Sequence, residues 1–119
     1  MFIINSPVVE TKQVHENIFI QKINSPEIAR IIKPGQFLNI RVSEATFPLL
    51  RRPFSICDVD GDNIFLMFNI LGEGTKILAR KNKGELIDIL GPLGNGFNFD
   101  DDYKNAIIVA GGLGAAPFP

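Results

Sequence analysis

The strongest constraint on the fold is a series of short segments with β-strand character, each separated from the next by turn residues. These segments are rich in β-branched and aromatic side chains and span residues 7–14, 17–23, 36–42, 53–59, 63–71 and 86–90. In the third of them Leu38, Ile40 and Val42 occupy every second position, so they share one face of a strand. Residues 63–71 are apolar on both faces, which predicts a central strand. The Asp-Gly-Asp sequence at 60–62 predicts a tight hairpin.

One helical turn and one short helix are expected beside the strands. Pro26 suits the first helical position of a turn within residues 24–30, and the Ser25 hydroxyl can accept a hydrogen bond from its free N–H groups. Residues 74–82 fit a short helix with Ile77 and Leu78 directed inward. The combination predicts an all-β fold, a closed antiparallel barrel of about six strands, whose closure leaves no free sheet edge.

The composition changes after Tyr103. Residues 106–110 form an all-apolar run, which is the pattern of a buried parallel strand, and the glycine-rich residues 111–117 follow directly. A parallel strand needs a crossover and a neighbouring strand. We therefore expect a barrel domain at residues 1–103 and the start of a truncated second domain at residues 104–119.

Charge and composition exclude several classes of function. Twelve basic and thirteen acidic residues give a net charge of −1, which provides no electrostatic basis for binding nucleic acid or an anionic membrane. No apolar run approaches the roughly 18 residues of a membrane span, and the N-terminus lacks the features of a secretory signal. The single cysteine, Cys57, excludes an internal disulfide and a cysteine-rich metal site. A reducing, cytoplasmic setting is the simplest interpretation.

Catalysis by side chains is not expected. His15 is the one histidine, and no Ser/His/Asp arrangement or metal-ligand cluster surrounds it in the sequence. Cys57 lies in a predicted strand and is expected to be a buried core thiol. If the protein is an enzyme, a cofactor therefore supplies the chemistry.

Two neighbouring arginines precede a strand and provide the first indication of a ligand site. A guanidinium group from Arg51 or Arg52 can hold a phosphate, Phe54 offers a flat ring, and Ser55 can hydrogen-bond to a ring heteroatom. Phe54 and Ser55 face opposite sides of the strand, so a ligand that touches both must lie across the strand end. The alternative is that the arginines form a solvated edge or a salt bridge.

A second indication is the sequence Gly-Glu-Gly-Thr at residues 72–75, between a strand and a helix. Glycine lets the backbone approach a ligand closely, and the Thr75 hydroxyl with the free N–H groups of the helix start can bind an anion. The alternative is a helix cap after a tight turn. Together, Arg52 and this helix start would suit a diphosphate. Residues 112–117 are similar to a dinucleotide-binding fingerprint but have Pro117 at the sixth place.

The order of these motifs resembles the ferredoxin–NADP reductase superfamily. The sequence Arg-Pro-Phe-Ser at residues 52–55 resembles its Arg-x-Tyr-Ser flavin motif, with Phe54 in place of the usual tyrosine, and residues 33–37, 74–75 and 112–117 follow its order. Within the superfamily, the paired arginines and the Gly-Pro-Leu-Gly-Asn-Gly-Phe sequence at 91–97 resemble the electron transfer subunits of class B dihydroorotate dehydrogenases. The similarity covers essentially the whole chain.

This resemblance implies a six-stranded antiparallel Greek-key barrel that binds FAD, followed by an NAD-binding domain of which residues 104–119 are the truncated start. Arg52 would contact the FAD pyrophosphate, with Pro53 beside it in the motif, Phe54 would pack on the flavin or ribityl, and Ser55 would approach the flavin N5 edge. Met67, Phe68 and Asn69 would line the ribityl and adenine side, although Phe68 and Asn69 stand where relatives often have tyrosine and arginine. Gly74 and Thr75 would hold the pyrophosphate.

The resemblance also implies partners. An FMN-containing dihydroorotate dehydrogenase catalytic subunit would form a heterotetramer with the whole protein, and the [2Fe–2S] cluster and NAD would bind in its C-terminal part. Electrons from dihydroorotate oxidation would pass to NAD+ in pyrimidine biosynthesis, and residues 1–119 alone would not be active with NAD. Two alternatives are a flavin subunit of another NAD(P)H–ferredoxin or sulfur-linked oxidoreductase, and a non-catalytic β-barrel interaction module.

Overall fold

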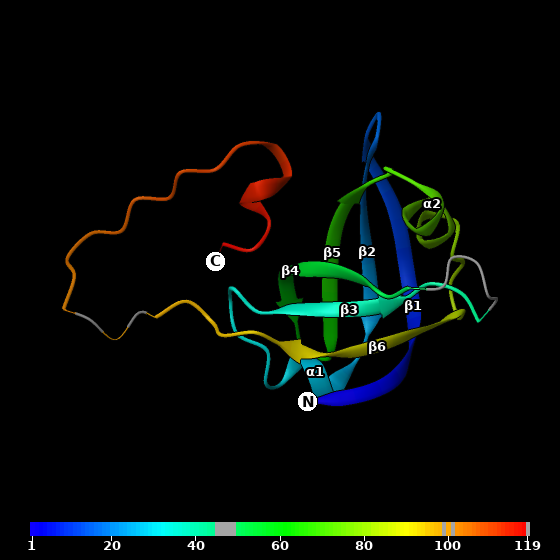
Figure 1. Ribbon diagram of the computed structural model, residues 1–119, viewed down its shortest axis with the longest axis horizontal. Helices are drawn as coiled ribbons and strands as arrows, with labels where there is room; N and C mark the ends of the chain where they lie inside the picture. The colour runs from blue at the N-terminus through cyan, green and yellow to red at the C-terminus, as the bar shows by residue number, and fades with distance from the viewer. Residues whose placement is uncertain (45–49, 99, 101, 119) are drawn as a thin grey trace.

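The six predicted strands close into one antiparallel barrel. The computed structural model describes residues 1–44, 50–98, 100 and 102–118. The strands are β1 (Phe2–His15), β2 (Ile18–Asn24), β3 (Phe37–Arg41), β4 (Arg52–Asp60), β5 (Asn63–Asn69) and β6 (Leu86–Leu93). They follow the order β1-β2-β5-β4-β3-β6 around the barrel, and every pair is antiparallel (Figure 1). Strands β3, β4 and β5 are consecutive neighbours and β6 returns beside β3, which is the Greek-key arrangement that the family resemblance implies.

Strand β1 is longer than the predicted segment at residues 7–14. Its first part, Phe2–Pro7, pairs with β6, and its second part, from Val8 to His15, pairs with β2. Pro7 has no N–H to donate and lies where the strand leaves one partner for the other. One bent strand therefore belongs to both sides of the barrel and helps to close it.

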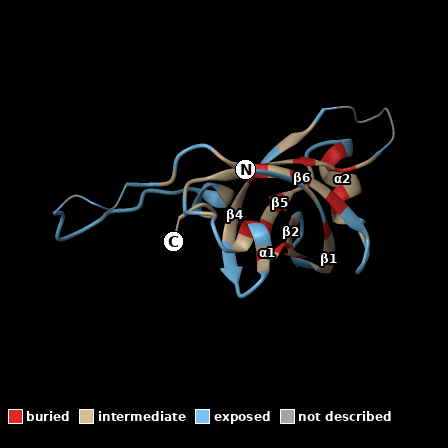
Figure 2. Cartoon of the chain, turned by 90° about the horizontal axis from the view of Figure 1, so that it is seen from below, coloured by how far each residue is buried: buried red, intermediate tan, exposed pale blue. Residues whose placement is uncertain are grey.

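The barrel interior is filled by alternate side chains from each strand. Leu38 and Ile40 on β3, and Val42 directly after it, are at most 2% exposed, which confirms the predicted inward face of this segment. Ile64, Leu66 and Phe68 on β5 and Ile87 and Ile89 on β6 complete much of this core (Figure 2). Strand β5 lies between β2 and β4, and its outward residues are half-buried. Gly61, with φ +59°, makes the predicted hairpin between β4 and β5.

The two helices occur where they are expected, with two corrections. Helix α1 spans Pro26–Ala29, but the Ser25 side chain does not cap it. Ser25 is fully buried, and its hydroxyl accepts a hydrogen bond of 3.0 Å from Ser6 Oγ instead. Helix α2 spans Glu73–Ala79 and is shorter than the predicted segment at residues 74–82. The N–H groups of Arg80 and Lys81 bond to carbonyls three residues back, which tightens the last turn and ends the helix.

The prediction of a buried strand at residues 106–110 is wrong for this structure. These residues contain no strand, and Ile107 and Val109 are 90% and 87% exposed. A parallel strand is buried only between neighbours, and none of the described residues pairs with this run. The chain then returns to the barrel through the 3₁₀ turn η1 (Gly112–Ala115), near the open ends of β4 and β5 (Figure 1). Within the described residues, no helix has the length and apolar character needed to cross a bilayer.

Candidate functional site

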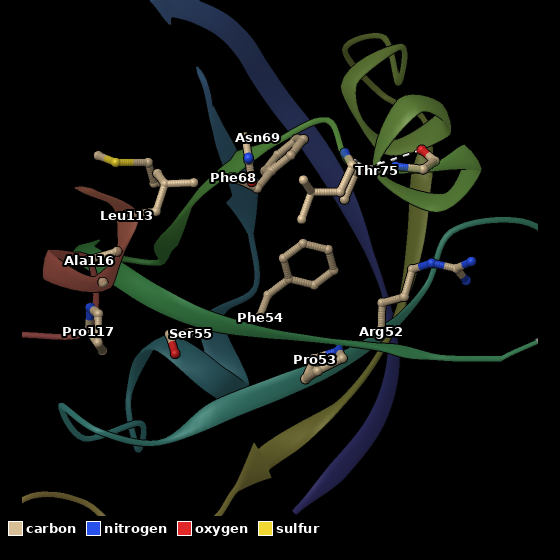
Figure 3. Close-up of a pocket in the computed structure, with 14 residues that line it drawn as sticks. Arg52, Pro53, Phe54, Ser55, Phe68, Asn69, Thr75, Leu113, Ala116 and Pro117 are labelled. Carbon is tan, nitrogen blue, oxygen red and sulfur yellow. Dashed lines mark hydrogen bonds between the residues drawn. The ribbon is translucent and has the colours of Figure 1, made fainter. Parts of the chain in front are cut away.

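A hollow of about 570 Å³ lies at one end of the barrel, between β4, β5, the start of α2 and the turn η1 (Figure 3). It is lined by Arg52, Pro53, Phe54, Ser55, Met67, Phe68, Asn69, Leu71, Gly72, Thr75, Leu113, Gly114, Ala116 and Pro117. This volume is within the range of roughly 300–1,000 Å³ that is usual for ligand pockets. The hollow collects the residues that the family resemblance assigns to FAD, with the exception of Gly74.

The antiparallel pairing of β4 with β5 brings these residues together. Ile56 on β4 pairs with Leu66 on β5, so the start of β4 and the end of β5 lie at the same end of the barrel. Helix α2 begins four residues after Asn69, the last residue of β5, and therefore stands beside the same opening. The start of β4, the end of β5 and the start of α2 thus contribute to one site.

The two neighbouring arginines have different surroundings. Arg51 is about a quarter exposed and forms an ion pair of 2.8 Å with Asp88 Oδ1 on β6. Its Nη1 also donates to the carbonyl oxygens of Asn39 and Asp88 at 3.3 Å. Arg52 lines the hollow, and its Nη1 donates to the Leu50 carbonyl at 2.7 Å. The salt-bridge interpretation therefore describes Arg51, and the ligand-site interpretation remains for Arg52.

Gly74 makes room for Arg52. A Cβ atom at Gly74 would lie 1.9 Å from Arg52 Nε and 2.4 Å from Arg52 Cζ. The guanidinium group therefore packs directly against the backbone at the start of α2. The expected proximity of Arg52 to this helix start is present, but Gly74 itself faces the arginine and does not line the hollow.

The Thr75 hydroxyl is a helix cap. Its Oγ1 accepts hydrogen bonds from the N–H groups of Leu71 at 2.9 Å and Gly72 at 3.3 Å, and it donates to the Gly72 carbonyl at 3.2 Å. The capping alternative therefore describes this side chain in the structure. The first N–H groups of α2 have no acceptor within the helix and remain suited to an anion.

Replacing Thr75 by valine should destabilise the chain by about 0.5–2 kcal/mol, because two N–H groups lose their acceptor. Urea unfolding followed by circular dichroism measures this change. Thr75→Ser, which keeps the hydroxyl, should retain most of the stability. Equal losses in the two variants would contradict the capping role.

The aromatic side chains of the site lie mostly inside the barrel. Phe54 is 9% exposed and Phe68 is 4% exposed. Their rings meet edge to face with centroids 5.9 Å apart, and Phe19 stacks behind Phe68 at 6.0 Å. Ser55 lies on the opposite side of β4 from Phe54 and is half-buried, as strand alternation predicts (Figure 3). The rings therefore form the floor of the hollow, and only their outer edges are exposed to it.

Several lining residues were not nominated for this site by the sequence. Leu113, Gly114, Ala116 and Pro117 stood out only as part of a dinucleotide-like fingerprint, and Gly72 only as part of the Gly-Glu-Gly-Thr sequence. Leu71 is 82% exposed and carried no signal in the sequence. The fold brings these residues beside Arg52 and Phe68.

The structure corrects the expectation for Cys57. This residue is only partly buried, on the outer side of β4, and it lines a separate hollow of about 270 Å³. Partial burial raises the pKa of the Cys57 thiol above its ordinary value of 9.0, and the neighbouring Asp58 carboxylate raises it further. Among the described residues, no cluster of His, Cys, Asp and Glu side chains could hold a metal ion.

The raised pKa makes a prediction about reactivity. At pH 8 the folded chain should react with iodoacetamide more slowly than the urea-unfolded chain, because less of the thiol is ionised. The rate should rise with pH around a midpoint above 9.0. The free energy of unfolding should decrease as the pH rises from 9.0 towards the higher pKa of the folded chain, because the thiol of the unfolded chain ionises first. Identical rates in the folded and unfolded chain would contradict this prediction, and Cys57 is the single cysteine that can report it.

Comparisons with known proteins agree with the fold. No protein-family model matches the chain. The chain is 44% identical over 117 residues to a dihydroorotate dehydrogenase B (NAD(+)) electron transfer subunit from Bacillus mycoides (strain KBAB4), and 42% identical to that of Bacillus cereus (strain Q1). Each match covers 95% of this chain and 45% of the relative, so the chain spans less than half the length of these relatives.

Solved structures of two ferredoxin-linked oxidoreductases have the same barrel. The ferredoxin reductase of carbazole 1,9a-dioxygenase matches 98% of this chain and 37% of its own, with a TM-score of 0.79 and 19% identity. The NADH-dependent reduced ferredoxin-NADP oxidoreductase structure matches 78% of this chain and 34% of its own, with a TM-score of 0.72 and 29% identity. The chain is thus similar over most of its length to dihydroorotate dehydrogenase B electron transfer subunits, and its barrel has the fold of ferredoxin-reductase FAD-binding domains.

Proposed function

We propose that this chain is the FAD-binding part of an electron transfer subunit of a class B dihydroorotate dehydrogenase, an oxidoreductase component. The observation that carries the proposal is one hollow lined by Arg52, by the start of α2 and by the edges of the Phe54 and Phe68 rings. The similarity to the named electron transfer subunits supports it.

The residues of the hollow suit the parts of FAD. Arg52, packed on Gly74, would meet the diphosphate together with the first N–H groups of α2, beside Thr75. Phe54 and Phe68 would support the planar and ribityl parts from the barrel side, with Met67 and Asn69 along the edge of β5. Figure 3 shows Arg52 and Ser55 toward opposite ends of the hollow, so a ligand with its charge at one end and its ring at the other fits the arrangement.

Bound FAD would supply the hydride and electron transfer chemistry. The contribution of this chain is to bind and orient. Arg52 would neutralise the phosphates, Pro53 would keep the start of β4 extended, and the Ser55 hydroxyl would hydrogen-bond at the flavin N5 edge. No acid–base group of the chain is needed for this role.

The activity of the whole protein is part of the same proposal. With an FMN-containing catalytic subunit as partner, it would transfer electrons from the oxidation of dihydroorotate to NAD+ in pyrimidine biosynthesis, in the cytoplasm. The [2Fe–2S] cluster and the NAD site would lie outside these 119 residues. The chain spans 45% of its relatives, which leaves room for both.

A second candidate is a flavin subunit of another NAD(P)H–ferredoxin oxidoreductase. The 29% identity to the NADH-dependent reduced ferredoxin-NADP oxidoreductase favours it. Co-purification separates the two candidates: a dihydroorotate dehydrogenase catalytic chain that captures this protein supports the first, and capture by a ferredoxin-linked partner supports the second.

Titration of the chain with FAD tests the cofactor proposal. We expect saturable binding, seen as quenching of flavin fluorescence and a shift of the visible flavin bands, and weaker binding of riboflavin, which lacks the phosphates that Arg52 would contact. Circular dichroism shows whether the barrel is folded in the same sample. A folded chain that takes up no FAD would contradict the proposal and favour an interaction module without a cofactor.

A further inference from the structure

We propose that the stacked rings of Phe97 and Phe118 position the turn at residues 112–117 against the Ser55 end of the hollow, and that these two phenylalanines are positioning residues for the flavin ring. The second part of this inference rests on the proposed function. Neither ring lines the hollow itself. Their effect is on the residues that do.

The two rings form a close parallel stack. Their centroids are 5.2 Å apart, and the angle between their planes is 4°. Phe97 comes from the loop after β6, and Phe118 follows the turn η1. Aromatic pairs at this separation attract each other beyond the simple burial of their area. The stack therefore joins the chain after η1 to the barrel.

Phe97 is firmly attached to the barrel side of this contact. Its N–H donates to the Pro34 carbonyl at 2.8 Å. Gly35, with φ +93°, allows this approach, because a Cβ there would lie 2.9 Å from the Phe97 nitrogen. A Cβ at Gly96 would lie 3.0 Å from Lys33 Cβ. Two glycines on facing loops thus let the loop with Phe97 seat against the turn before β3.

The chain with Phe118 has a different kind of support. The backbone hydrogen bonds of residues 111–118 run within that segment, from Gly114 to Gly111, Ala116 to Leu113 and Phe118 to Ala115. Residues 102–111 before it are exposed and contain no regular secondary structure. The segment is therefore a compact turn at the end of an extended connection. We infer that the contact of Phe118 with Phe97 fixes its position on the barrel.

The contact at its end places the turn on the hollow. Leu113, Ala116 and Pro117 line the hollow, and Figure 3 shows Pro117 beside Ser55. Pro117 and Phe118 also line the neighbouring hollow on the outer side of β4, together with Cys57. Loss of the Phe118 ring should therefore loosen the turn beside Ser55 and leave the opposite end, at Arg52 and α2, unchanged.

The test compares Phe118→Leu and Phe97→Leu with Phe118→Tyr, which keeps a ring that can stack. Tyr103→Leu is the control, because it removes an aromatic side chain that is 77% exposed in the same connection. Hydrogen exchange of the amides at residues 112–116 and 118, measured without FAD, should become about 2- to 10-fold faster in both leucine variants, the range expected for one aromatic stack. Phe118→Tyr and Tyr103→Leu should exchange like the unchanged chain.

With FAD bound, collisional quenching of flavin fluorescence by iodide should increase at least about 2-fold in the leucine variants, because the ring end is less covered. The dissociation constant for FAD should change by less than about 3-fold, since the Arg52 end is intact. Unchanged exchange in Phe118→Leu would overturn the stack as a positioning contact. Faster exchange with unchanged quenching would overturn its role toward the flavin ring. A chain that binds no FAD would refute the proposed function, while the exchange measurement would still decide the role of the stack.

Discussion

Replacing Arg52 by alanine should raise the dissociation constant for FAD by about 10- to 100-fold, which corresponds to roughly 1.5–3 kcal/mol for a charge-assisted contact. Arg52 lines the hollow, and the one hydrogen bond found for it among the described residues goes to the Leu50 carbonyl. Its guanidinium therefore keeps donors available for phosphate oxygens. Fluorescence titration with FAD, at constant ionic strength, measures the change.

Arg80→Ala is the matched control for this variant. Arg80 is an exposed cation at the other end of α2 and does not line the hollow, so its loss changes the net charge by the same amount. We expect its affinity for FAD to stay close to that of the unchanged chain. Equal affinities in Arg52→Ala and the unchanged chain would remove Arg52 from the site.

Replacing Gly74 by alanine should raise the dissociation constant for FAD by about 10-fold, towards the value for Arg52→Ala, without unfolding the barrel. The new Cβ would lie only 1.9 Å from Arg52 Nε. Because the arginine side chain is flexible, its guanidinium must move away from the start of α2. Alanine is a better helix former than glycine by about 1 kcal/mol, so the stability of α2 should be maintained. Titration with FAD and urea unfolding of the same variant separate binding from folding.

The double variant makes this prediction sharper. If Gly74→Ala acts by displacing Arg52, the combination of Gly74→Ala with Arg52→Ala should bind FAD no more weakly than Arg52→Ala alone. Gly111→Ala is the control, because a Cβ there meets open space and the backbone is extended. Additive losses in the double variant would show that Gly74 acts independently of the arginine.

Much of the barrel was predictable because strands and turns follow local rules. Alternation of apolar residues every two positions identified the inward face of β3, and the Asp-Gly-Asp turn identified the β4–β5 hairpin. The early part of β1 was missed, because its pairing with β6 depends on residues more than 80 positions away. Ser25 was predicted to cap a helix because a local rule favours serine there. In the structure its hydroxyl is buried and accepts a hydrogen bond from Ser6 instead.

The sequence by itself determined which residue types are present for a flavin-like ligand and in what order: an arginine before Pro-Phe-Ser, a strand end, and a glycine-rich helix start. Only the tertiary structure decided which of the two adjacent arginines lines the hollow. Arg51 is held by Asp88 on β6, and Arg52 fits over Gly74, and both facts depend on segments that meet only when the barrel closes. The same holds for Phe97 and Phe118, since side-chain contacts between distant segments depend on how the chain folds back and leave no periodic signal in the sequence.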